Sequence, residues 1–293
     1  MSDDRPVPPP RSAWSDFLDR ALAEDLGRAG DLTTQAIVAA EARARAVIAA
    51  RGHGVVAGLF ILPELFARLD AQVHVALRAG DGDRVDAGAA LAALSGPARA
   101  LLAGERVALN LLGRLSGIAT ATRDLVDRLA GTGAAVVDTR KTTPTLRALE
   151  KYAVRCGGGR NHRFGLDDAV LVKDNHVVAA GGVGEAVRRA RAGVGHLVKV
   201  EAEITRLDQL EEAIVAGADV VMLDNFGVDD LRIAVAANRG RVPLEASGGV
   251  TSETIRDIAE SGVDLISVGW ITHSAPALDI ALDFVDGAAA GAS

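Results

Sequence analysis

Cationic residues are concentrated in one stretch of an otherwise acidic chain. Seven arginines and lysines lie between Thr139 and Leu166, where the only acid is Glu150. They are Arg140, Lys141, Arg147, Lys151, Arg155, Arg160 and Arg163, and His162 adds to the set. Arginine binds carboxylates and phosphates through paired hydrogen bonds, so the stretch indicates a ligand with several negative charges. Arg147, Lys151 and Arg155 are spaced four apart and are expected to form a solvated helical face. The candidate binding residues are then Arg140, Lys141, His162 and Arg163.

Two acids, Glu203 and Asp224, follow successive apolar runs and are 21 residues apart. An acid pair beside a polyanion site can hold Mg²⁺ or ribose hydroxyls, and it can stabilise a cationic, oxocarbenium-like centre. The alternative is an outward salt bridge to the arginines. Glu201 and Glu203 are expected to share one side of an extended run, and the sequence leaves open which of them reaches the site.

Glycines mark a candidate phosphate site. Ser247-Gly248-Gly249 precedes a predicted helix, and Gly269 ends the last apolar run, with Thr272 and His273 nearby. Glycine lets backbone N–H groups approach a phosphate, and a helix N-terminus favours the anion.

Short apolar runs alternate with amphipathic helices in the second part of the chain. The runs are Ala134–Val137, Ala169–Val172, Leu197–Val200, Val220–Leu223, Val242–Leu244 and Leu265–Val268, and the later ones recur every 21 to 26 residues. This rhythm predicts a parallel sheet, in a closed or nearly closed α/β barrel. The ends of barrel strands form one rim, where active sites and phosphate loops lie. A doubly wound open sheet is the alternative, although no G-x-G-x-x-G follows a strand. Thr143-Pro144 and Thr251 predict helix starts.

The first part of the chain has a different pattern. Residues 1–11 predict a loose arm, residues 14–22 a helix, and residues 98–130 a long helix that contains a domain boundary. Between the two helices, the apolar runs Ala46–Ala50, Val55–Ile61 and Val73–Leu77 predict a small sheet. We expect domains at 1–112 and 113–275. Residues 276–293 are a candidate for packing back onto the first domain, with a frayed tail at 287–293.

Composition narrows the class of protein. The net charge of −7 and a pI near 5.4 argue against a general nucleic-acid binder. The single cysteine, Cys156, excludes an internal disulfide and a paired-cysteine metal site. No leader-like or membrane-spanning apolar run is present, so we expect a cytoplasmic protein without membrane or nucleic-acid partners.

Seven separated motifs resemble the quinolinate phosphoribosyltransferase family. The first three are Asp138-Thr139-Arg140-Lys141-Thr142-Thr143-Pro144, Gly157-Gly158-Gly159-Arg160-Asn161-His162-Arg163 and Lys173-Asp174-Asn175-His176. Glu201-Ala202-Glu203, Leu223-Asp224-Asn225-Phe226, Glu245-Ala246-Ser247-Gly248-Gly249 and Ser267-Val268-Gly269 continue in the family's order and spacing. The resemblance covers about 20–285. The one visible departure is Ala202, where the family usually has a larger apolar residue. That position is expected to pack inward.

The resemblance implies a fold and a reaction. The fold is an N-terminal α/β sandwich domain plus a C-terminal α/β barrel of the type II phosphoribosyltransferase kind. The reaction transfers phosphoribosyl from phosphoribosyl pyrophosphate to quinolinate with decarboxylation, giving nicotinate mononucleotide, pyrophosphate and CO₂ for NAD synthesis. It also implies Mg²⁺ as cofactor and a homodimer with shared active sites, which a higher homo-oligomer would also provide.

Site roles follow from the same resemblance. Quinolinate would be bound by Arg106 of the partner's copy and by Arg140, His162, Arg163 and Lys173. Phosphoribosyl pyrophosphate would be bound by Lys141, Glu203, Asp224, Ser247, Gly248, Gly249, Gly269 and His273. Lys141, Lys173, Glu203 and Asp224 would be catalytic, and Glu203 and Asp224 would hold Mg²⁺ directly or through substrate or water. Lys173 or water would supply the proton at C2.

Several rival interpretations remain at this stage. A nicotinate phosphoribosyltransferase would run the same transfer without decarboxylation, but the cation density favours a dicarboxylate. A paralogue linked to molybdenum transport would share the fold. A regulatory domain that binds phosphorylated metabolites would need the glycines but not the acid pair. Nucleic-acid binding by the arginine stretch lacks interleaved aromatic residues, since only Tyr152 and Phe164 lie there.

Overall fold

The computed structural model describes residues 5–285 as two compact units. Within this range the first unit is assembled from residues 5–123, 142–158 and 272–285, and the second from residues 124–141 and 159–271. The predicted frayed tail at 287–293 lies outside the described residues, as do positions 1–4 of the predicted arm. Over the described range, no helix is both long and apolar enough to cross a membrane.

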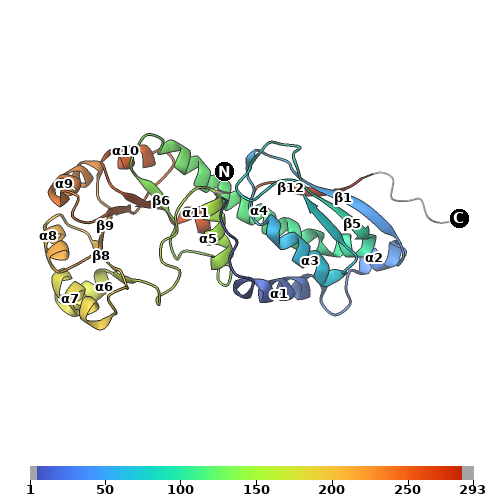
Figure 1. Cartoon of the computed structure of the whole chain (residues 1–293), viewed down its shortest axis with the longest axis horizontal. Coiled ribbons are helices and arrows are strands. Elements are labelled where there is room, and N and C mark those ends of the chain that lie inside the picture. The colour runs from blue at the N-terminus through green and yellow to red at the C-terminus, as the bar shows by residue number, and fades with distance from the viewer. Residues whose placement is uncertain (1–4, 286–293) are drawn as a thin grey trace. The chain divides into compact units, whose positions relative to one another are not determined.

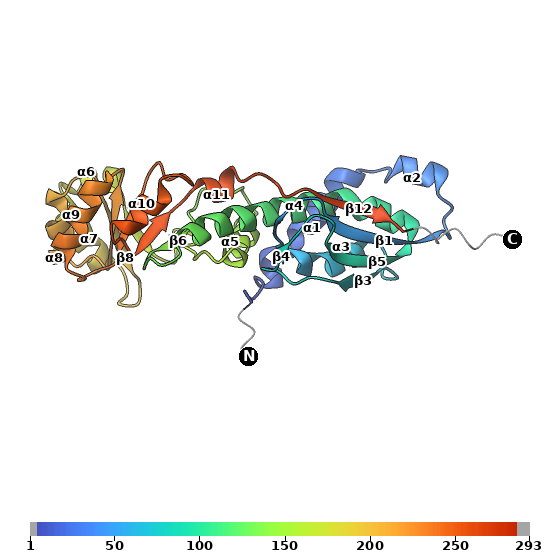
Figure 2. The same ribbon diagram turned by 90° about the horizontal axis from the view of Figure 1, so that it is seen from above.

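The first unit is built on a four-stranded antiparallel sheet with the order β12-β1-β5-β3 (Figure 2). Its strands are β1 (Arg43–Ala50), β3 (His74–Leu77), β5 (Ala90–Pro97) and β12 (Ile280–Phe284), and β2 (Gly54–Val55) pairs separately with β4 (Arg84–Val85). Its helices are α1 (Ser15–Leu26), α2 (Leu32–Ile37), α3 (Leu62–Leu69), α5 (Arg147–Cys156) and most of α4 (Ala98–Arg128), with short 3₁₀ turns η1 (Arg11–Ala13) and η2 (Leu59–Ile61).

Close packing of two helices accounts for part of this unit's core. Phe66 of α3 is fully buried, and α4 presents Gly104 toward it. A Cβ at Gly104 would lie 2.7 Å from the ring of Phe66, so only glycine allows this approach. The predicted strand Val55–Ile61 is wrong beyond Val55, because Leu59–Ile61 forms η2, which leads directly into α3. A short apolar run fits a buried helical turn as well as a strand.

Buried charge holds the segment that precedes α5. Glu150 is fully buried and pairs with Arg114 of α4 at 2.9 Å. Its other contacts are the backbone N–H of Thr143 at 2.9 Å and the Thr143 hydroxyl at 2.7 Å. Thr143 is therefore tied to Glu150 and does not cap the helix, which begins at Arg147. The predicted solvated face is also wrong in part, because Lys151 is fully buried while Arg155 is exposed.

The second unit is a six-stranded parallel sheet with the order β6-β11-β10-β9-β8-β7. Its strands are β6 (Ala135–Val137), β7 (Val170–Val172), β8 (Val200–Ile204), β9 (Val220–Asp224), β10 (Leu244–Ser247) and β11 (Leu265–Ser267). The helices α7 (Val183–Gly193), α8 (Asp208–Val215), α9 (Val228–Asn238) and α10 (Ile255–Glu260) lie around its outside (Figure 1). Beyond β6, Arg160 makes a parallel bridge to Val137, so the sheet continues one residue past its end strand. This is the predicted α/β barrel, left incomplete between β6 and β7 in the described residues.

Two strands lie further along the chain than predicted. β8 begins at Val200, so Glu201 and Glu203 are within the strand and do not follow it. β10 begins at Leu244 and includes Glu245. Ala202, between the two acids of β8, is fully buried as expected, which leaves both glutamates on the opposite side of the strand. Thr251 also does not begin α10 directly, because a turn separates it from Ile255.

Candidate active site

The rim at the carboxyl ends of the parallel strands collects most of the candidate residues. Arg140 and Lys141 follow β6, Lys173 follows β7, and Asp224 ends β9. Ser247 ends β10 directly beside Asp224, because the two are register partners in the parallel ladder. Parallel pairing therefore places residues that are far apart in sequence at one edge of the sheet.

A lysine and a glutamate meet at this rim. The ammonium group of Lys173 donates to Oε2 of Glu203 at 2.5 Å. The Lys173 side chain is 46% exposed and that of Glu203 is 10% exposed, so the pair lies where solvent or a ligand can reach the lysine. The backbone N–H of Lys173 donates to Nδ1 of His176 at 2.9 Å, which fixes the start of α6 (Asp174–Ala180).

Two guanidinium groups lie near one another on the β6 side. Burial lowers the pKa of Arg163, the positive charge of Arg140 lowers it further, and Asp168 and Glu201 act in the opposite direction. Nη1 of Arg163 donates to the carbonyl of Ala169 at 3.0 Å. Neighbouring cations that are partly removed from water favour a bound anion between them.

Carboxylate groups hold the two residues that precede Arg163 in place. Asp138 is fully buried and accepts from the backbone N–H of His162 at 2.8 Å and from Nδ2 of Asn161 at 2.6 Å. Nε2 of His162 lies 2.8 Å from Oε2 of Glu201, and its Nδ1 accepts from the backbone N–H of Arg163 at 2.8 Å. Both ring nitrogens therefore contact protein groups.

Glu245 completes a cluster that sequence reasoning did not single out. Its side chain is 1% exposed and its Oε2 lies 3.9 Å from Nε2 of His162. Burial raises the pKa of Glu245 to about 8, and the negative charge of Glu201 adds to the rise. Among the described residues, Oε1 of Glu201 and Oε1 of Glu245 are buried without a hydrogen-bond partner. Buried acids inside a strand resemble loop residues in a sequence, and only their shared place in the barrel reveals them.

The glycine turn after β10 is tightly enclosed on one side. Gly248 has φ +96°, and a Cβ there would lie 2.1 Å from Oδ1 of Asn225. Gly249 has φ +60°, but a Cβ there would have nothing within 4 Å. Asn225 itself donates its backbone N–H to the carbonyl of Ser247 at 2.8 Å and its Nδ2 to Asp224 at 2.7 Å. The backbone after β10 is thus fixed against the end of β9.

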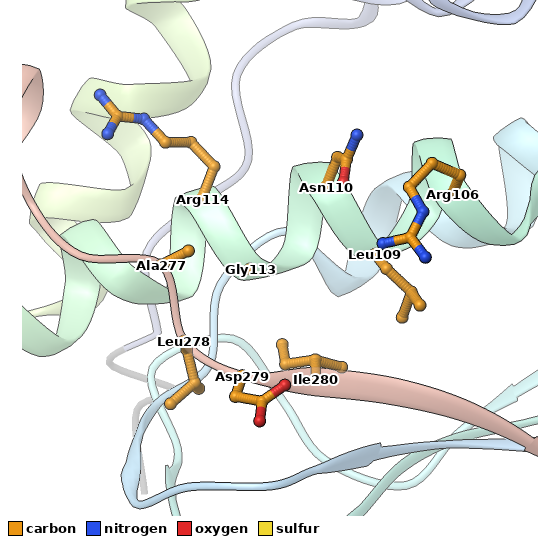
Figure 3. A pocket seen from close by; sticks show the side chains of 9 residues that line it. All are labelled: Arg106, Leu109, Asn110, Gly113, Arg114, Ala277, Leu278, Asp279 and Ile280. Carbon is orange, nitrogen blue, oxygen red and sulfur yellow. The ribbon is translucent and has the colours of Figure 1, made fainter. Parts of the chain in front are cut away.

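Arg106 and His273 belong to the first unit. Arg106 is exposed on α4 and lines a cavity of about 420 Å³ between α4 and the segment that leads into β12 (Figure 3). The cavity is also lined by Asn110, Arg114 and Asp279. His273 is exposed at the end of α11 (Trp270–His273), with Nδ1 2.5 Å from the hydroxyl of Ser274. Gly269, four residues earlier, belongs to the second unit.

A parallel α/β unit with cations, acids and glycine turns on one rim is typical of enzymes that bind phosphorylated substrates. Two family models match, the quinolinate phosphoribosyl transferase N-terminal domain over residues 31–116 and its C-terminal domain over residues 118–283. The chain belongs to the quinolinate phosphoribosyltransferase family.

Individual relatives agree over nearly the whole length. The chain is 49% identical over 267 residues to the probable nicotinate-nucleotide pyrophosphorylase (carboxylating) of Bacillus subtilis, covering 91% of this chain and 92% of that protein. The solved structure of NadC from Streptococcus pyogenes is 40% identical, with a TM-score of 0.91 and coverage of 96% of this chain and 100% of that one. A human nicotinic acid phosphoribosyltransferase is 14% identical with a TM-score of 0.57 over 95% of this chain and 74% of that one, which shows a shared fold alone.

Proposed function

We propose that the chain transfers phosphoribosyl from phosphoribosyl pyrophosphate to quinolinate with decarboxylation, which gives nicotinate mononucleotide, pyrophosphate and CO₂ for NAD synthesis. Family membership supports the reaction class. The observation that carries the choice of substrate is the pair of neighbouring guanidinium groups of Arg140 and Arg163. Lys173, whose side chain is half exposed, follows β7 on the same rim as Arg140. A pyridine with two carboxylates supplies the negative charge that such a set requires, whereas nicotinate supplies half of it.

The residues divide into two subsites. We propose that Arg140, His162, Arg163 and Lys173 form the subsite for the quinolinate ring, and that Arg106 of a second copy completes it. Phosphoribosyl pyrophosphate would be bound by the rest of the rim, with its 5′-phosphate at the glycine turns. The proposed ligands on the rim are Lys141, Glu203, Asp224, Ser247, Gly248, Gly249 and Gly269, and His273 is a further proposed ligand. The contact between Lys173 and Glu203 supports this division, because it joins the two subsites at one point.

The proposed reaction forms a nitrogen–C1 bond and a C2–H bond, and it breaks the C1–O and C2–carboxylate bonds. The pyridine nitrogen attacks C1 of the ribose while the C1–O bond to pyrophosphate breaks, and positive charge develops at C1. The carboxylates of Glu203 and Asp224 stabilise that charge electrostatically. The C2–carboxylate bond then breaks, CO₂ leaves, and the electron pair at C2 takes a proton. We propose Lys173 as the donor, with water as the other source.

Magnesium fits the acid pair by the chemistry of its donors. Glu203 and Asp224 offer only carboxylate oxygens, which Mg²⁺ prefers, and they come from adjacent strands. We propose that these two residues hold it directly or through substrate or water. When bound, Mg²⁺ would neutralise the leaving pyrophosphate. A cytoplasmic location and a homodimer are also part of the proposal.

The test is a release assay with the purified protein, phosphoribosyl pyrophosphate and Mg²⁺. Carboxyl-labelled quinolinate and nicotinate are offered separately, and labelled CO₂ and mononucleotide are measured. We expect equal amounts of CO₂ and nicotinate mononucleotide from quinolinate alone, and loss of both when Mg²⁺ is chelated. Mononucleotide from nicotinate, with no CO₂ from quinolinate, would retain the phosphate site and overturn the substrate.

A further inference from the structure

The cluster below the quinolinate subsite has a defined hydrogen-bond direction. The backbone N–H of Arg163 can only donate, so Nδ1 of His162, 2.8 Å away, must accept and carries no proton. In a neutral ring the proton is then on Nε2, which donates to the carboxylate of Glu201 at 2.8 Å. A protein group therefore determines the hydrogen-bonding role of each ring nitrogen of His162.

This arrangement argues against a metal ion in the cluster. Nε2 of His162 and the carboxylate oxygens of Glu201 and Glu245 all lie within 4.8 Å of one another, which is close enough for a shared ion. A histidine that binds metal through Nε2 uses that lone pair and donates a proton from Nδ1. Here Nδ1 is an acceptor, so the ring has the opposite tautomer. The short distance between Glu201 and Glu245 therefore has a reason other than a shared metal ion.

We propose that Glu201 is a positioning residue for quinolinate: its carboxylate fixes the tautomer and plane of His162, and His162 in turn holds the backbone of Arg163 beneath the substrate. The inference rests on the proposed function and adds to the quinolinate subsite a residue, Glu201, that supports it through His162. Glu201 acts on the substrate through His162 and Arg163, so it is not a catalytic residue.

Arg163 is held at both of its ends by this arrangement. Its backbone N–H is fixed by His162, and its guanidinium donates Nη1 to the carbonyl of Ala169. Asp138, one residue past β6, fixes the backbone of His162. An arginine that binds a planar carboxylate in bidentate fashion needs such an orientation, because small displacements weaken both hydrogen bonds.

Glu245 is an uncharged neighbour of the Glu201–His162 pair. Because its pKa is raised to about 8 by burial and by the charge of Glu201, its carboxyl group holds a proton at neutral pH. Glu201 is the nearer of the two acids to His162, with its Oε2 2.8 Å from Nε2. Glu245 lies only 3.9 Å from Nε2, so a test must prevent it from replacing Glu201.

The experiment compares Michaelis constants for the two substrates in the full-length protein. His162→Phe and the double variant Glu201→Leu/Glu245→Leu should each raise KM for quinolinate about tenfold or more, because Arg163 is no longer held in place. KM for phosphoribosyl pyrophosphate should change less than about threefold, since the rest of the rim is intact. Glu201→Gln keeps an oxygen that accepts from Nε2 and should remain within about threefold of wild type for quinolinate.

Coupling between the two residues separates support from direct contact. If Glu201 acts through His162, adding the Glu201→Leu/Glu245→Leu pair to His162→Phe should worsen KM for quinolinate by less than about twofold. Independent effects that multiply would overturn the proposal, as would a folded leucine double variant with normal KM for quinolinate. His53→Phe is the matched control, because His53 also contacts a carboxylate, Asp86, at 2.8 Å but on an exposed surface.

A measurement on the wild-type protein removes the dependence on variants that fold. Histidine labelled with ¹⁵N gives distinct shifts for the two tautomers, and the His162 signal is assigned by its loss in His162→Gln. The proposal requires a proton on Nε2 and none on Nδ1 at neutral pH, and the opposite tautomer would refute it. A wild-type protein that releases no CO₂ from quinolinate would instead refute the proposed function.

Discussion

The stability of this chain should depend on pH through one buried carboxyl group, Glu245. Its pKa is raised from 4.5 to about 8, mainly by burial and then by Glu201, while His162 lowers it and Asp138 raises it again. At a pH between these two pKa values, Glu245 holds a proton in the folded state that it has lost in the unfolded state. The contribution of Glu245 to the free energy of unfolding therefore falls as pH rises, by up to about 1.4 kcal/mol per pH unit.

Glu245→Gln isolates this effect because the amide does not titrate. The difference in unfolding free energy between wild type and variant should change by up to roughly 5 kcal/mol across the range, with wild type favoured at the acidic end. Below pH 4.5 and above pH 8 the difference should be constant. Urea unfolding at fixed protein concentration, followed by circular dichroism at pH 5, 6, 7 and 8, measures it. A difference that is constant over this range would refute the inference that Glu245 is protonated in the folded state.

The remaining predictions concern the rim and the second copy. Gly248→Ala should weaken binding of phosphoribosyl pyrophosphate about tenfold or more, because the added Cβ has no room. Gly249→Ala has room for the Cβ and should cost less than about 2 kcal/mol of stability. Calorimetric titration with phosphoribosyl pyrophosphate compares the affinities of the two variants. Lys173→Ala should lower kcat about 100-fold or more with unchanged circular dichroism, while the exposed Lys199→Ala should have normal turnover; near-normal turnover in the first would refute its role. Inactive Arg106→Ala and Lys173→Ala proteins, mixed and allowed to exchange subunits, should regain activity if sites are shared, and continued inactivity after verified exchange would contradict that arrangement.

Much of the second unit could be predicted because its strands and its chemistry are both periodic. Six apolar runs predicted six parallel strands, and the polar residues after them predicted one rim. The predicted position of β8 was wrong because Glu201 and Glu203 have the pattern of polar residues that follow a strand. Sequence patterns treat acids as solvated, whereas the structure pairs one with His162 and the other with Lys173.

The first unit was less predictable because burial of charge decided its local structure. Lys151 has helical spacing with Arg147 and Arg155, which usually indicates a solvated face, but it is fully buried. Glu150 is also fully buried and holds Thr143, a link that only the path of the chain creates. Spacing along a helix identifies its faces but does not identify which of them will be covered.

The pairing of β12 with β1 has a consequence for how the protein is made. Ala46 lies opposite Phe284 in that ladder, so the first sheet cannot be completed until residues 280–284 have left the ribosome. Until then the outer edge of β1 has unpaired backbone groups that can join another chain. All six strands of the parallel sheet are synthesised earlier and can pair while the nascent chain is still attached. The sheet of the first unit is therefore completed after that of the second, and the unpaired edge of β1 is where premature release or crowding of nascent chains would lead to aggregation.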